Sequence, residues 1–272
     1  MLTISTIAAI ATALVIGLAA NHYRCRQALE GGDETSVRDP LKTLAVLLVA
    51  FVMVMAAQSY DTASQAASSE AHRVDQLYEV ADYAPEPQRE RLQAAAVCYA
   101  RAILAYEWPQ MDKSHRMDSE ASVWSSDFRR HFKELAHKNA NTFEILVDVD
   151  DQRSAARQTR LHEASPAIPP TLFWFMTIAL AATIGAFAFG LPCRRRPSHV
   201  ILLCVLAALF TGSLLIVEDI DRPFSGYIRI TSEAMADTTG DISSDFAQDH
   251  PGRPLPCDIR GARTGQTDSP ER

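Results

Sequence analysis

Residues 43–83 read TLAVLLVAFVMVMAAQSYDTASQAASSEAHRVDQLYEVADY. The first half of this stretch is apolar enough to enter a bilayer, and the second half has the pattern of an amphipathic helix. No Pro or Gly interrupts the junction, so we expect one continuous helix that leaves the membrane near Gln58 and continues into water. About forty residues at a rise of ~1.5 Å each would make a rod of roughly 60 Å, about twice the hydrocarbon thickness.

Apolar residues are concentrated in four blocks of the 272-residue chain rather than spread in short periodic runs. The blocks are Leu2–Ala20, Thr43–Ala57, Thr171–Leu191 and Val200–Val217. The second block is the shortest, and Tyr60 extends it through the interface, where tyrosine is favoured. We therefore predict an all-α, four-span integral membrane protein with an extramembrane helical bundle between spans two and three.

This pattern divides the chain into six parts. They are residues 1–42 (first span and polar loop), 43–60 (second span), 61–170 (helical bundle), 171–217 (third and fourth spans with a short Arg-rich loop), 218–232 (membrane-edge motif) and 233–272 (tail). The first block has no basic residues before it and exceeds a typical signal-peptide core, so we expect an uncleaved span. Gly31, Gly32 and Pro40 are expected to break any helix in the first loop. The tail is rich in Asp, Ser, Thr, Gly and Pro, which predicts disorder.

Within the predicted bundle, apolar positions recur in steps of three and four, as in packed helices. After the second span these positions are Tyr60, Ala63, Ala67, Ala71, Val74, Tyr78 and Ala81. Pro109 ends the next helix, because proline disfavours the helical conformation of the residue before it. Arg153, Arg157 and Arg160 share one face of the last bundle helix. That face is either solvated and close to lipid headgroups or a cationic vestibule that concentrates anions.

No nucleotide-binding loop, G-x-S-x-G or H-E-x-x-H motif is present in the sequence. We therefore expect no enzymatic activity, no catalytic residue, no cofactor and no metal. Asp148, Asp150 and Asp151 lack the glycine of a calcium loop and are interpreted as a solvated run of charge. The formal net charge of −7 argues against nucleic acid as a partner, which selects basic surfaces.

Five scattered cysteines fit no zinc or redox motif, so we interpret them as unpaired thiols. They are Cys25, Cys98, Cys193, Cys204 and Cys257. Cys25 and Cys193 lie in loops that must face the same side of the membrane. A disulfide between them requires that side to be oxidising.

Four spans place both termini and the bundle on one side of the membrane. The two short loops on the other side hold four and three Lys or Arg residues. The positive-inside rule assigns such loops to the cytoplasm, so we expect the bundle to be extracytoplasmic at a bacterial plasma (inner) membrane.

Two segments carry a family resemblance: LLVAFVMVMAAQSYDTASQAASSEAHRVDQLYEVA, and then PEPQRERLQAAAVCYARAILAYEWPQM. They resemble the core of the bestrophin-like family of bacterial membrane proteins, and order and spacing fit from about Leu44 to Ser232. The matching motif positions are Glu70, Tyr99, Glu107, Trp108, Pro109, Arg157, Arg160, Leu161, Asp221, Arg222, Pro223, Phe224, Ser225 and Gly226. One departure is Asp39-Pro40-Leu41-Lys42, where the family usually carries a polar His-Asn-Asp type motif.

The resemblance implies similarity to bestrophins, which are homo-oligomeric anion channels with a pore lined by the second helix. The expected partners are then the bilayer, further copies of the chain and small anions. The expected pore wall is Val52, Val54, Met55 and Gln58, with Arg157 and Arg160 as an anion-attracting vestibule. Glu70 and Glu107 are interpreted as structural, capping or hydrogen-bonding to neighbouring helices.

The alternative is a non-conducting membrane scaffold or sensor whose bundle binds a protein or itself. The Ala-rich seam and the long rigid helix favour this alternative as much as a pore. The resemblance also bears on orientation, because bestrophins place their helical region in the cytoplasm, opposite to the expectation from loop charge. Both orientations stay open at this point.

Overall fold

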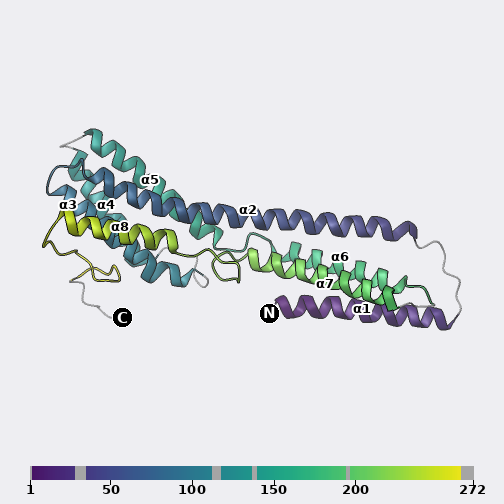
Figure 1. Cartoon of the computed structure of the whole chain (residues 1–272). Coiled ribbons are helices and arrows are strands. Elements are labelled where there is room, and N and C mark those ends of the chain that lie inside the picture. Colours follow the sequence, from purple (N-terminus) through teal and green to yellow (C-terminus); the bar gives the residue numbers. More distant parts are fainter. Residues whose placement is uncertain (1, 28–34, 112–117, 137–139, 194–196, 265–272) are drawn as a thin grey trace, which may run out of the picture. The chain divides into compact units, whose positions relative to one another are not determined.

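The computed structural model describes residues 2–27, 35–111, 118–136, 140–193 and 197–264. These residues are helical with short connections, and they form two compact units (Figure 1). The first unit contains residues 1–59 and 166–221, and the second contains residues 60–165 and 222–272. The division falls within α2 (Thr35–Ala81), which is one continuous helix, as its sequence predicts.

The first unit is the membrane-spanning part. It combines α1 (Leu2–Arg26), the first half of α2, α6 (Pro170–Phe189) and α7 (Pro197–Ile220). Each of these four helices is long and apolar enough to cross a bilayer, which confirms the predicted number of spans. Their shared core is mostly apolar, and its side chains pack closely, as helix association in lipid requires. It includes Val52 from α2, Ile184 from α6 and Leu214 from α7.

The first loop is shorter than predicted. α1 continues to Arg26, α2 already begins at Thr35, and Pro40 lies inside α2 instead of breaking it. The prediction that Pro40 prevents a helix was therefore wrong. Gly31 and Gly32, the other predicted breakers, lie outside the described residues.

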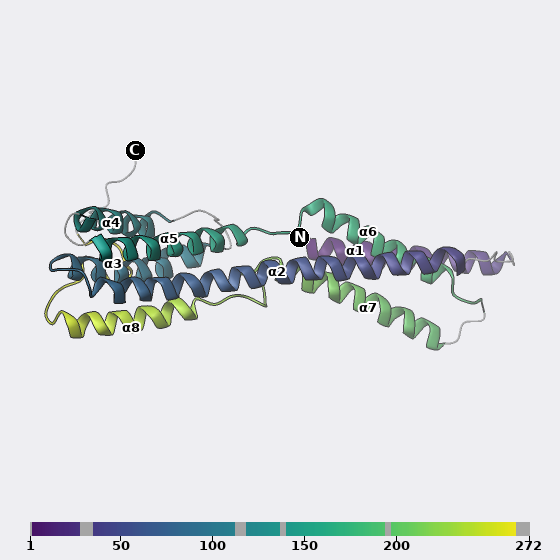
Figure 2. The same ribbon diagram turned by 90° about the horizontal axis from the view of Figure 1, so that it is seen from above.

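The second unit is a helical bundle. The rest of α2 packs with α3 (Gln88–Ala102), α4 (Ser119–Ala136), α5 (Ala140–Glu163) and α8 (Glu233–Asp249). A π-helical turn (Ile103–Glu107) and a 3-10 turn (Trp108–Gln110) follow α3 directly. Figures 1 and 2 both show α8 on the side of this bundle opposite to α5.

One wall of the bundle core is the stripe of apolar positions that the sequence predicts on α2. Ala71, Val74 and Tyr78 are buried against small residues of α3, such as Ala95, which let the two helices approach closely. Larger side chains complete the core, and among them Tyr99 of α3 packs near Phe128 of α4 at 6.1 Å between ring centroids.

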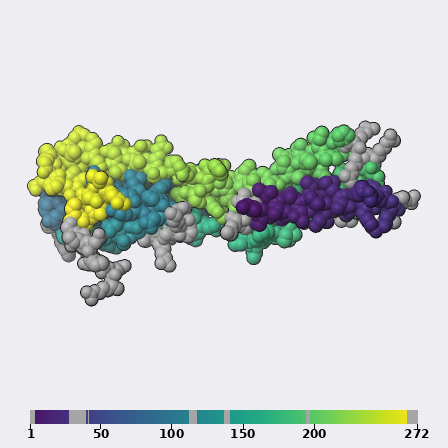
Figure 3. All heavy atoms as spheres, turned by 90° about the horizontal axis from the view of Figure 1, so that it is seen from below, coloured from purple at the N-terminus to yellow at the C-terminus, as the bar shows by residue number. Residues whose placement is uncertain are grey.

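The tail predicted to be disordered is ordered as far as Thr264, so that prediction was wrong for most of its length. α8 buries Met235, Ile242 and Phe246 in the bundle core. The following residues, yellow in Figure 3, lie against the blue surface of the bundle. Trp124 Nε1 donates to the Gly261 carbonyl at 2.7 Å, and Gly261 adopts φ 86°, a conformation that favours glycine.

Two disulfides correct the prediction of unpaired thiols. Cys25 pairs with Cys193 in the membrane-spanning unit, the pairing that the sequence made conditional on an oxidising side. Cys98 of α3 pairs with Cys257, which holds the C-terminal segment to the bundle. Among the described residues Cys204 is the free cysteine.

Candidate functional site

Three arginines of α5 point into the bundle rather than into solvent. Arg153, Arg157 and Arg160 retain 1%, 3% and 0% of their exposed surface. A buried arginine requires carboxylate partners, since an unpaired buried charge is very costly. The hypothesis of an open cationic vestibule at Arg157 and Arg160 is therefore wrong for this conformation, and so is the alternative of a solvated face.

Glu107 is the carboxylate that links two of these arginines. It closes the π-helical turn, and Arg157 Nε donates to both of its carboxylate oxygens at 3.1 Å, while Arg157 Nη2 donates to Oε2. Arg160 Nη2 donates to Glu107 Oε1 at 2.6 Å. The backbone N–H of Asp118 adds a further hydrogen bond to Oε2 at 3.0 Å.

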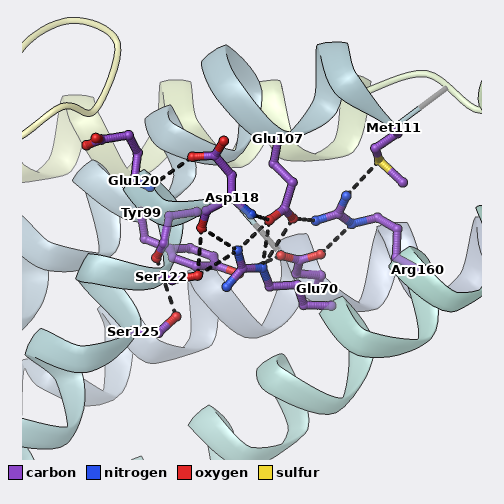
Figure 4. Close-up of polar contacts among 11 residues, drawn as sticks. Glu70, Tyr99, Glu107, Met111, Asp118, Glu120, Ser122, Ser125 and Arg160 are labelled. Carbon is purple, nitrogen blue, oxygen red and sulfur yellow. Dashed lines mark hydrogen bonds and ion pairs between the residues drawn. The ribbon is translucent and has the colours of Figure 1, made fainter. Parts of the chain in front are cut away.

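Glu70 completes the network from α2. Arg160 Nε donates to Glu70 Oε2 at 2.6 Å, and the Tyr99 hydroxyl donates to Glu70 Oε1 at the same distance. Figure 4 shows Glu70, Glu107 and Arg160 pointing toward one another, with Met111 beside the guanidinium. Arg160 also lies 5.0 Å from the ring centroid of Trp108, a favourable cation–π distance.

Arg153 extends the network by one further turn of α5. It forms an ion pair with Asp150 at 2.6 Å, and its guanidinium lies 4.4 Å from the ring centroid of Tyr99. Asp150 is itself buried, so its interpretation as part of a solvated charge run was wrong. In total, three carboxylates (Glu70, Glu107, Asp150) meet three guanidiniums (Arg153, Arg157, Arg160) around Tyr99.

The charges of this network determine its protonation. Burial alone would raise the pKa of Glu107, but the hydrogen bond from Arg157 and the charge of Arg160 outweigh it, so the pKa lies below the usual glutamate range. Burial also raises the pKa of the Tyr99 hydroxyl, opposed by Arg153 and reinforced by Glu70. Glu107 is therefore ionised at neutral pH, and Tyr99 keeps the proton that it donates to Glu70.

The motif after the fourth span is divided between the two units. In the membrane-spanning unit, Asp221 Oδ1 accepts hydrogen bonds from the backbone N–H groups of Ala167 and Ile168 at 2.9 and 3.0 Å. In the bundle unit, the Phe224 ring meets Trp108 edge-on at 5.8 Å between centroids. The turn of the motif is closed by hydrogen bonds from the Ser225 and Gly226 N–H groups to the Arg222 carbonyl.

The positions predicted to line a pore differ in their surroundings. Val52 is completely buried against other spans of its own chain, whereas Val54 keeps 54% of its surface exposed. Met55 is partly exposed and Gln58 is exposed. Of the predicted wall positions, Val54, Met55 and Gln58 are thus accessible to a neighbouring subunit or to lipid.

The pairing of charges in the bundle network determines what the network can bind. Every carboxylate in it is neutralised by a guanidinium, and the strongest donors and acceptors are used within the chain. Within the described residues no group of three or more His, Cys, Asp or Glu side chains is placed to hold a metal ion. An ion-paired network of this kind fixes α2, α5 and the turn after α3 relative to one another.

Sequence reasoning identified Glu70, Tyr99 and Glu107 only through family motifs, whereas the spacing of the α5 arginines showed their shared face. It did not identify Asp150, Asp118 or Met111 as partners. The spacing of four and three between the α5 arginines was the available signal, since three cations on one apolar-packed face require buried acids.

The fold and its buried network define an all-α multispan membrane protein with an ion-paired helical bundle. The Bestrophin-like domain model matches residues 40–235, and the chain belongs to the Bestrophin-like family. That range contains all the residues of the network and the motif after the fourth span.

Solved structures share the fold. A bacterial Bestrophin homolog from Klebsiella pneumoniae carrying a point mutation matches with a TM-score of 0.68 at 10% identity, over 91% of this chain and 100% of its own. A second structure of a Klebsiella pneumoniae homolog gives a TM-score of 0.67 at 11% identity, over 91% and 99% of the two chains. Comparison with curated proteins gave no match.

Proposed function

We propose that the chain is one subunit of a homo-oligomeric ion channel in which α2 borders the pore. The family membership supports this proposal at the level of fold, and the surface of α2 carries it at the level of residues. Within its most apolar window only 17% of α2 is buried by its own chain, the lowest share of the four spans, against 22% for α1 and for α7 and 39% for α6. A membrane helix so little covered has a large area left for further subunits or lipid.

The uncovered face of α2 follows helical spacing. Leu44, Leu47, Phe51 and Val54 keep between 48% and 62% of their surface exposed, and they recur in steps of three and four. Among the described residues, the buried polar side chains of the four spans are Thr6, Asn21, Thr177 and Thr183, and none of them is ionisable, so a single subunit supplies no charged path there. An ion path bordered by α2 therefore needs several copies arranged in a ring.

The permeant ion is the second element of the proposal. The resemblance to bestrophins implies small anions, but Arg157 and Arg160 no longer support that choice because buried carboxylates neutralise them. The exposed residues that follow the span on α2 include Asp61, Gln65 and Ser68, which bring no positive charge. We therefore propose conduction of small inorganic ions. Reversal potentials measured across an ion gradient determine whether these ions are anions or cations.

Particle mass tests the ring directly. The full-length protein is extracted into native nanodiscs and its mass is measured without crosslinking. A closed ring of about four or more subunits supports the channel. A monomer or dimer that persists across mild extraction conditions contradicts it and favours the non-conducting scaffold.

A matched pair of cysteine substitutions tests the pore wall. In a Cys204→Ser background, Val54→Cys and Val52→Cys are reconstituted into liposomes and treated with a charged methanethiosulfonate reagent. We expect ion flux to change only for Val54→Cys, because Val52 is buried within its own subunit. Unchanged flux at position 54, or an equal change at both positions, contradicts the proposed role of α2.

A further inference from the structure

The bundle contains a cavity of about 510 Å³ that is lined by α3, α4 and the segment that follows α8. Ala94 and Ala95 of α3 and Trp124 of α4 form its apolar part and retain 5%, 2% and 1% of their surface. None of the residues of the buried ion-pair network lines this cavity. Its volume falls in the range of small-molecule sites, which is about 300–1,000 Å³. The cavity is therefore a second candidate site, separate from the network.

One end of the cavity carries excess positive charge. Asp127 of α4 is 6% exposed and forms ion pairs with Arg130 of the same helix and with Arg263 of the C-terminal segment. One carboxylate neutralises one guanidinium, so a positive charge remains at this end. Each arginine contacts Asp127 through Nη2, and a guanidinium has five N–H donors, which leaves donors for an incoming anion.

The other two acids of the lining are paired with arginines. Glu134 Oε2 lies 3.5 Å from Arg91 Nη1, and Glu90 Oε1 lies 3.8 Å from the Nε atom of Arg253, which adjoins the lining in sequence. Four guanidiniums and three carboxylates thus surround the cavity, with one positive charge in excess. This balance suits a ligand that carries one negative charge, because a charge-assisted hydrogen bond to a guanidinium is among the stronger polar contacts.

His131 adds a hydrogen-bonding group one helical turn beyond Asp127 on α4. The side chain lines the cavity, and the residue is 9% exposed. In the described part of the chain its buried Nδ1 has no hydrogen-bond partner, since the Glu134 oxygen beside it lies 3.9 Å away. Buried polar atoms are seldom left unpaired in this way. The imidazole therefore has hydrogen-bonding capacity that the bundle does not use.

The imidazole is neutral at neutral pH. Burial lowers the pKa of His131, opposed by the charge of Glu134 and reinforced by the charges of Arg130 and Arg91. A neutral imidazole has one nitrogen that donates and one that accepts a hydrogen bond, and a hydroxyl group can do both. A ligand hydroxyl is thus a suitable partner for His131 in either tautomer.

We propose that this cavity binds a small organic acid that has one carboxylate, an apolar body and a hydroxyl group. The carboxylate accepts hydrogen bonds from Arg130 and Arg263, the apolar body lies over the α3 alanines, and the hydroxyl pairs with His131. The two polar ends are separated by about one helical turn, ~5.4 Å. Every contact lies within one bundle, so the proposal does not depend on ion conduction. 4-Hydroxybenzoate has the three features in this order and serves as the probe.

The first test measures the role of the carboxylate. The full-length protein in nanodiscs is titrated calorimetrically with 4-hydroxybenzoate at neutral pH, and empty nanodiscs give the blank. We expect Arg130→Gln to weaken binding at least about tenfold, because it removes a charged donor. The Arg130 side chain is 58% exposed, so the fold should survive its loss. Arg129→Gln, an exposed neighbour outside the lining, is the matched control and should bind like the wild type.

The neutral analogue 4-hydroxybenzamide should likewise bind the wild type at least about tenfold more weakly than 4-hydroxybenzoate. Three results overturn the proposal. They are no binding of 4-hydroxybenzoate to the wild type, equal losses in Arg130→Gln and Arg129→Gln, and equal affinity for the acid and the amide.

The second test measures the role of His131 through a ratio of affinities. The wild type should bind 4-hydroxybenzoate about 3–10-fold more tightly than benzoate, which lacks the hydroxyl. In His131→Leu the two acids should bind equally. Both ligands are measured on the same variant, so a general loss of stability does not alter the ratio. A wild type without this preference, or a preference that persists in His131→Leu, contradicts the assignment of His131.

Discussion

Glu70 on α2 and Arg160 on α5 lie 90 positions apart in the sequence and form a direct ion pair, with 2.6 Å between Glu70 Oε2 and Arg160 Nε. Both side chains are completely buried. Glu107 then joins Arg160 to Arg157, so three separate segments are tied by charge. The energetic consequence is asymmetric, because removing one member leaves its partner charged and buried.

Replacing Glu107 by Gln should therefore be severely destabilising. The variant leaves Arg157 and Arg160 short of a negative charge in the core, and removal of one partner of a buried pair costs about 3–5 kcal/mol. Thermal unfolding of the purified protein, followed by tryptophan fluorescence, measures the loss. Glu144→Gln, on the exposed side of α5, is the matched control and should be neutral. A combined Glu107→Gln, Arg157→Gln variant should lose less than the sum of its single losses, and strict additivity would contradict direct coupling.

The same network predicts how stability depends on pH. The pKa of Glu107 is lower in the folded protein than its ordinary value of 4.5. The group therefore stabilises the fold above the unfolded pKa, and this stability is lost as the pH falls below about 4.5 and through the folded pKa. Unfolding midpoints measured between neutral pH and about pH 3.5 should fall steeply for the wild type. The decline should be shallower for Glu107→Gln, and identical slopes would exclude Glu107 as a contributor.

The sequence predicted the elements of this fold better than their partners. The four apolar blocks gave the spans, and the Ala-rich stripe with Val74 and Tyr78 gave the buried face of α2. The shared face of the three α5 arginines was visible too. Their carboxylate partners could not be predicted. Periodicity shows which face of a helix is buried, but it does not show which distant segment packs against that face. Arg160 pairs with both Glu70 and Glu107, and no local sequence pattern links these three positions.

The C-terminal part was missed for a different physical reason. α8 buries Met235, Ile242 and Phe246, but many Asp, Ser and Thr residues dilute that stripe, so composition suggested disorder. The disulfide between Cys98 and Cys257 anchors this region from outside the helix. Two cysteines 159 positions apart carry no pairing signal in a single sequence.

Docking of the C-terminal segment on α3 should depend on Gly261. A Cβ at this position would lie 2.3 Å from the Ala102 nitrogen and 2.7 Å from the Cys98 carbonyl, at a φ of +86°. Gly261→Ala should cost about 1–3 kcal/mol of stability through strain alone. It should also disturb the hydrogen bond to Trp124, which shifts tryptophan emission. Gly240→Ala is the control, since a Cβ there meets no atom within 4 Å. Equal stability of the two variants would show that the segment does not dock on α3 as described.

The contact between α1 and α6 should depend on Gly17 in the same way. A Cβ on Gly17 would lie 2.5 Å from the Gly185 carbonyl oxygen and 2.8 Å from the Ala188 Cβ, so neither backbone could keep its place. Overpacking of this kind costs about 1–3 kcal/mol. Gly17→Ala should therefore lower the temperature at which the protein aggregates in nanodiscs, while Gly212→Ala on α7, with no atom within 4 Å, should not. The displaced α1 should also form the Cys25–Cys193 bond more slowly after reduction, because that bond requires the ends of α1 and α6 to meet. If Gly17→Ala matches the control in both measurements, the close approach of these two helices is contradicted.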